Sequence, residues 1–128
     1  MLLDIHQGFA WFVIVSNGLS GLWFLAAHRW EVLRTRAMWW FLIAAELTVF
    51  VQVILGVMLV TGVGGTKYEP PKFHMLYGFF GIFTIGILYS YKGSMRKWQY
   101  LLYGLGGLFI MGLGIRAVLV GTQPIGSG

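Results

Sequence analysis

The chain has 128 residues, of which 58% are hydrophobic and only 10% are charged, and its mean hydropathy is +0.77. Because a soluble domain carries about 25% charged residues, the composition excludes an ordinary soluble protein and predicts an integral membrane protein. Cysteine is absent, which excludes disulfides, Cys-held iron–sulfur clusters and the attachment of a c-type haem. The net charge of +5 does not indicate nucleic-acid binding, since the basic residues lie in short loops between apolar segments.

Four apolar segments follow one another along the chain, at residues 5–27, 38–62, 73–91 and 98–120. Since a helix needs about 20 apolar residues to cross a membrane, each segment is long enough to span it. The sequence therefore predicts an all-α fold, a single transmembrane four-helix bundle over residues 1–128 with up-down-up-down topology.

The basic residues predict the orientation of this bundle. The first and third connections, residues 28–36 and 91–97, each hold three Lys or Arg, whereas the second, residues 61–72, holds only two. Positively charged loops stay in the cytoplasm, so we expect a multi-pass protein of the cell membrane with both termini on the outer side. A belt of interfacial tryptophans is then expected at the inner boundary, formed by Trp30, Trp39, Trp40 and Trp98.

Two histidines lie near the outer ends of parallel helices. At about 1.5 Å per residue, His6 lies about 32 Å above the inner end of the first helix and His74 about 26 Å above that of the third. The first and third helices of such a bundle are diagonally opposite, so the two imidazoles are expected to face each other. Bis-histidine ligation of a b-type haem has this arrangement.

Small residues and one arginine extend the predicted haem site. Gly78 and Gly81 follow His74 on its helix face and leave room for the edge of a ring. Arg116 of the fourth helix is expected at about 27 Å, near the depth of the histidines, and a haem propionate is a natural partner for it. Alternatively, the glycines seat a neighbouring helix, Arg116 extends to the outer surface, and each histidine is an interfacial hydrogen-bonding residue.

Two further polar residues have separate interpretations. His28 lies at the inner end of the first helix with no second histidine at that depth, so we interpret it as an interfacial residue and expect one haem at most. Glu46 lies about 120° around the second helix from Gln52, so the two side chains are not expected to face the same bundle interior. Since a carboxylate against lipid is costly, we expect the Glu46 face to contact another membrane subunit. Gln52 and Asn17, nearer the midplane, are expected to hydrogen-bond across the interior.

Three short stretches resemble a known family: Ile5-His6-Gln7-Gly8-Phe9, Gln52-Val-Ile-Leu-Gly56 and Phe73-His74-Met75-Leu76. They are similar to four-helix b-type cytochrome bundles, and most to one half of the heme A synthase family. That family has eight spans in two bundles, whereas this chain has four. The resemblance implies a single haem site that uses His6 and His74.

The leading interpretation is therefore an electron-transfer protein rather than a stand-alone enzyme: a small b-type cytochrome, or a haem-bearing subunit of a respiratory or photosynthetic complex, near the outer membrane face. The alternative is a cofactor-free accessory or assembly subunit whose glycines and Glu46 pack against partners. A third interpretation is that the same histidines bind chlorophyll, which also accepts an axial imidazole. A transporter is disfavoured, since no broken helix is visible in the sequence.

Overall fold

The computed structural model describes residues 2–63, 65 and 67–121, and in this part of the chain it is all-helical without strands. The four long helices are α1 (Leu2–Arg29), α2 (Arg36–Thr61), α3 (Lys72–Tyr91) and α4 (Gln99–Gly121). Two short 3-10 turns, η1 (Glu31–Leu33) and η2 (Arg96–Trp98), lie between them. Each of the four is long and apolar enough to cross a membrane, so the predicted class of fold is confirmed, with bounds within a few residues of those expected.

Local signals in the sequence explain several helix ends. Thr35 precedes α2 and its hydroxyl accepts a hydrogen bond from the Met38 amide at 3.3 Å, which satisfies one free donor of the first turn. Gly62 follows α2 in the left-handed conformation, with φ of 79°, a backbone state that glycine adopts without strain. Pro71 directly precedes α3, where its lack of an amide proton costs nothing.

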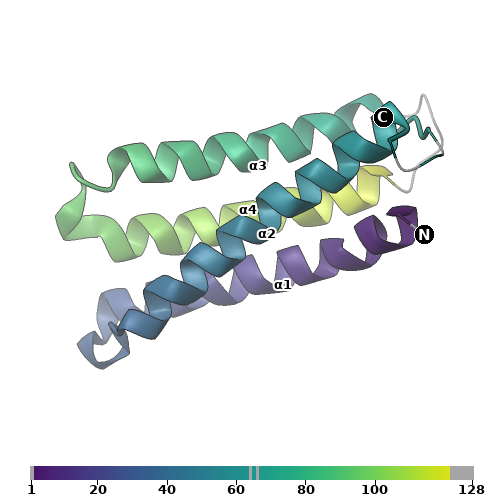
Figure 1. Ribbon diagram of the computed structural model, residues 1–128. Helices are drawn as coiled ribbons and strands as arrows, with labels where there is room; N and C mark the ends of the chain where they lie inside the picture. Colours follow the sequence, from purple (N-terminus) through teal and green to yellow (C-terminus); the bar gives the residue numbers. More distant parts are fainter. Residues whose placement is uncertain (1, 64, 66, 122–128) are drawn as a thin grey trace.

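The helices form a bundle in which α4 packs most extensively against α1, as Figure 1 shows. α3 lies along α4, and α2 crosses the bundle at a steeper angle, so the seam between α2 and α3 is the smallest of the four main helix interfaces. Close approach of α1 and α4 depends on glycine. A Cβ placed on Gly107 would lie 2.8 Å from the backbone oxygen of Asn17, and one on Gly21 would lie 2.8 Å from that of Gly104.

The best-packed part of the interior is an aromatic cluster. Phe24 is fully buried, and its ring centroid lies 4.9 Å from that of Trp39 and 5.6 Å from that of Tyr103. Every helix nevertheless exposes large apolar side chains on its outer face, such as Phe12, Ile54, Phe83 and Phe109, which are 56–65% exposed. Apolar surface of this extent is out of place in water, as expected of helices that face lipid.

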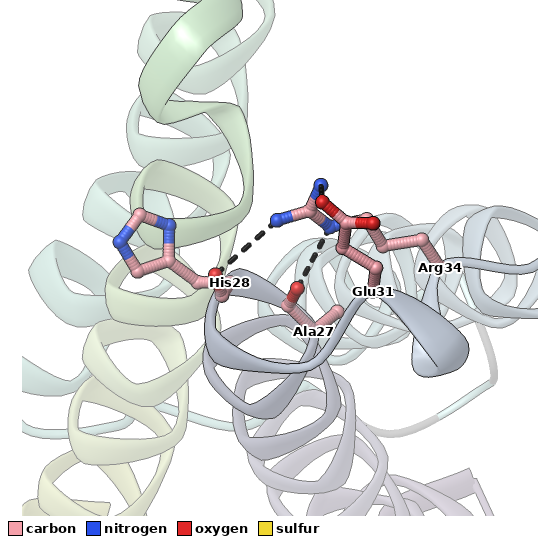
Figure 2. Close-up of polar contacts among 4 residues, drawn as sticks. All are labelled: Ala27, His28, Glu31 and Arg34. Carbon is pink, nitrogen blue, oxygen red and sulfur yellow. Dashed lines mark hydrogen bonds and ion pairs between the residues drawn. The ribbon is translucent and has the colours of Figure 1, made fainter.

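Contacts between helices define two ends of the bundle. The histidine end combines the starts of α1 and α3 with the ends of α2 and α4, since His6 contacts Gly56 and His74 contacts Gly121. The opposite end of the bundle holds residues 28–36 and 91–97, each with three Lys or Arg, and is called the basic end. There Arg34 caps α1, as Figure 2 shows: its Nε donates to the Ala27 carbonyl at 2.8 Å and its Nη2 to the His28 carbonyl at 3.2 Å.

Candidate functional site

His6 and His74 lie together at the histidine end. Their ring centroids are 6.0 Å apart and their planes are inclined by 79°. His6 lies one turn into α1 and His74 at the start of α3, and both are partly buried. The two side chains that the sequence singled out, 68 positions apart in the chain, are thus near neighbours in the fold.

α4 fixes the His74 ring. The Nδ1 atom of His74 lies 2.8 Å from the carbonyl oxygen of Ala117. Since a carbonyl can only accept, Nδ1 carries the proton and donates, which leaves Nε2 with its lone pair free. Metal-bound histidines in proteins are typically oriented in this way. Gly121 permits the contact, because a Cβ there would lie 2.7 Å from Nδ1.

α2 positions His6 through two residues one turn apart. Gln52 donates from Nε2 to the backbone carbonyl of His6 at 2.7 Å. A Cβ on Gly56 would lie 3.3 Å from Cε1 of the imidazole, so glycine leaves room for the ring. Within the described part of the chain, Nδ1 of His6 and Oε1 of Gln52 are buried without a hydrogen-bond partner. Buried polar atoms without partners are uncommon in folded proteins, so these two call for an explanation beyond packing.

Arg116 reaches the same end of the bundle. It directly precedes Ala117, the residue whose carbonyl holds His74, and its Nε lies 3.4 Å from the Tyr77 hydroxyl. That distance is long for a hydrogen bond, and the arginine is exposed. Its guanidinium therefore lies beside Tyr77 at the bundle surface and is weakly held.

The two glycines of α3 face α2. A Cβ on Gly78 would meet a Val53 methyl at 3.7 Å, and one on Gly81 a Val49 methyl at 3.4 Å. These are ordinary packing distances, so the structure places both glycines where they seat a neighbouring helix, the alternative that the sequence left open. A haem ring lying over these two glycines would require α2 to move away from α3.

The two interior amides join α1 to α2, although not to each other. Asn17 is buried, and its Nδ2 donates to the carbonyls of Val13 at 2.9 Å and Ala45 at 3.1 Å. Gln52 instead binds the His6 carbonyl. Both amides thus hydrogen-bond across the interior, as expected, and they do so to backbone carbonyls of the facing helix rather than to each other.

Glu46 is partly buried within α2. It lies within electrostatic range of Lys92 and of the Tyr103 hydroxyl. Glu46 and Gln52 thus face different neighbours within one bundle. The cost of placing a carboxylate in lipid, which was the reason to expect another subunit, is reduced by the chain's own residues.

His28 lies apart from the pair, at the basic end. Its ring centroid is 5.8 Å from that of Trp98, and Figure 2 shows the imidazole pointing away from Arg34. Among the described residues, no group of three or more His, Cys, Asp or Glu is placed to hold a metal ion. The candidate site therefore offers two imidazoles as ligands, from His6 and His74.

The geometry defines the chain as an all-helical protein with four helices able to cross a membrane and a pair of histidines at one end. Comparison with protein families, with curated proteins and with solved structures found no match to the chain.

Sequence reasoning missed three parts of this site: Gly56, Gly121 and the Ala117 carbonyl. Gln52 and Gly56 are four residues apart and so share a helix face, which was a usable signal for a contact with His6. Nothing in the sequence marks Gly121 or Ala117, because their role depends on where α4 ends beside α3.

Proposed function

We propose that the chain binds one b-type haem between His6 and His74 and carries electrons as a small membrane cytochrome or a haem-bearing subunit of a larger complex. The observation that carries the proposal is the spacing of the two rings. Because an imidazole nitrogen binds a metal at about 2 Å, two rings on opposite sides of one metal have nitrogens about 4 Å apart and centroids roughly 6 Å apart. The centroid distance of 6.0 Å agrees with that arrangement.

The donor set also suits haem. A six-coordinate b-type haem takes four ligands from the porphyrin and two from the protein, which is the number of imidazoles here. Ala117 holds His74 in the tautomer with Nε2 free, and Nδ1 of His6 is buried without a hydrogen-bond partner among the described residues, so this nitrogen is available to a ligand. Bound haem would supply the redox chemistry.

Residues around the two histidines would orient the bound haem and balance the charge of its propionates. Arg116 is exposed beside Tyr77 at the histidine end, where its charge would stabilise a propionate that reaches the bundle surface. Gln52 holds the His6 backbone, and Gly56 and Gly121 leave space for the two rings. Gly78 and Gly81 would line the edge of the haem if α2 moved away from α3.

The experiment that tests the haem proposal is an absorption spectrum of the full-length chain, purified from membranes with haem supply, in oxidised and dithionite-reduced forms. We expect the sharp reduced bands of a low-spin b-type haem at one haem per chain. A chain that shows no visible absorption after haem reconstitution contradicts the proposal. A band typical of chlorophyll would replace haem by that pigment.

A cofactor-free accessory subunit is the second candidate, and one observation favours it. His74 already joins α3 to α4 through Ala117, and the glycines already seat Val49 and Val53, so the site has structural roles without a cofactor. The same spectrum distinguishes the two candidates.

We further propose up-down-up-down topology with the basic end in the cytoplasm, because six of the nine basic residues lie in residues 28–36 and 91–97. A reporter fused after Gly128 is expected to be active only on the outer side of the cell membrane. The matched fusion within the loop between α3 and α4, after Gly93, should report the cytoplasm. A cytoplasmic signal after Gly128 would reverse the orientation and place the histidines inside.

A partner subunit at the Glu46 face stays a prediction. A photo-crosslinker at position 46, in native membranes, is expected to capture a neighbouring chain if the seam between α2 and α3 is covered in a complex. Position 83 is the control, because Phe83 is 65% exposed on α3 and is expected to capture lipid. Capture of lipid alone at both positions would contradict the predicted partner.

A further inference from the structure

A surface hollow lies at the basic end of the bundle, where α3 turns into α4. It has a volume of about 480 Å³ and is lined by Tyr89, Lys92, Gly93, Arg96 and Gln99. This volume falls within the range of about 300 to 1,000 Å³ that is typical of small-ligand sites. The hollow is far from the histidine pair and has no role in the proposed electron transfer.

The lining of the hollow is positively charged and rich in hydrogen-bond donors. It contains two cations, a phenol and an amide, and no carboxylate. The Lys92 ammonium lies 5.1 Å from the centroid of the Trp39 ring, and Glu46 is within its electrostatic range, so its charge is partly balanced. Arg96 has no side-chain hydrogen bond or ion pair to any residue that the structure describes, and it carries the uncompensated charge.

The backbone around the hollow also favours an anion. α4 begins at Gln99, so the partial positive charge of the start of a long helix lies at the wall of the hollow. Gly93 is exposed, and a Cβ there would meet nothing within 4 Å, which leaves the turn open to a ligand.

We propose that this hollow binds the headgroup of an anionic phospholipid, with the phosphate against the Arg96 guanidinium. An arginine fork matches phosphate oxygens in geometry and charge, and basic pockets between membrane helices are suited to such headgroups. The lipid source follows from the surroundings. Tyr89, which lines the hollow near the end of α3, is 76% exposed, so its ring offers the acyl chains an apolar surface beside the charged groups.

Native mass spectrometry of the full-length chain in detergent, titrated with phosphatidylglycerol and separately with phosphatidylcholine, tests this proposal. We expect saturable binding of one phosphatidylglycerol at a lower concentration than phosphatidylcholine. Arg96→Gln is expected to weaken that binding about fivefold, as loss of one cation near an anionic surface predicts. Lys97→Gln is the matched control, because Lys97 is the next residue but does not line the hollow, and it should change the affinity less than twofold.

Three results would overturn the proposal. They are equal affinity for the two lipids, an equal loss in Arg96→Gln and Lys97→Gln, and displacement of the lipid by millimolar inorganic phosphate. The first two indicate a diffuse basic belt, and the third a site for free phosphate. Circular dichroism checks that each variant keeps its helices. Arg96→Lys, which keeps the charge but loses the fork, is expected to have an affinity between those of the wild type and Arg96→Gln.

Discussion

Replacement of His6 or His74 with alanine is expected to abolish the reduced b-type absorption band of the full-length chain. Each substitution would remove one of the two proposed haem ligands, and a bis-histidine haem needs both. The two variants should have different structural costs. His6→Ala keeps the backbone carbonyl that Gln52 binds, whereas His74→Ala also removes the bond to Ala117. Loss of the band in His6→Ala with unchanged helicity would therefore report ligation rather than folding.

His28→Ala is the matched control for these variants. His28 lies at the basic end beside Trp98, far from the pair, so its removal is expected to leave the band and its intensity unchanged. A full band in both His6→Ala and His74→Ala would rule out the ligand assignment. Loss of the band in His28→Ala would place the haem at the other end of the bundle.

Gly107→Val is expected to destabilise the bundle by about 3 kcal/mol, the upper end of the usual cost of overpacking. A Cβ on Gly107 would lie 2.8 Å from the Asn17 oxygen and 2.8 Å from the Gly21 Cα. Both atoms belong to the backbone of α1, which cannot rotate away as a side chain can, so α1 and α4 must separate. The shift in the unfolding midpoint in denaturing detergent measures the effect.

Gly112→Val on the same helix is the control, because a Cβ there meets nothing within 4 Å. It is expected to change the free energy of unfolding by less than about 0.5 kcal/mol, as for other surface substitutions. Equal destabilisation by the two variants would mean that the contact between α1 and α4 does not govern the effect.

The fold follows closely from the sequence because lipid imposes a simple rule. A chain segment in a membrane must satisfy its own backbone hydrogen bonds, and an uninterrupted apolar run does so as a helix. The apolar run at 38–62 and the helix Arg36–Thr61 differ by only a few residues, since Thr35 and Gly62 mark its ends by local chemistry. Most of the 19 glycines have no such local signal, and sequence reasoning left their packing partners open.

The candidate site was predicted in part. Helix direction and depth alone placed His6 near His74, and the distance between their rings agrees with that expectation. The same reasoning did not show that Gly78 and Gly81 face α2, or that Glu46 faces Lys92 and Tyr103. Helical periodicity gives the angle between two residues of one helix but not the rotation of that helix in the bundle.

The sequence by itself determined the class of protein, the four helices and the two histidines near one end, because these depend on composition, length and spacing within single segments. Only the tertiary structure decided which helices touch. The pairing of α1 with α4 through Gly21 and Gly107, the hold of Ala117 on His74 and the contact of Gln52 with His6 all join residues of different helices. The physical reason is that in lipid the hydrophobic effect does not choose between helix faces, so close packing and interhelical hydrogen bonds do.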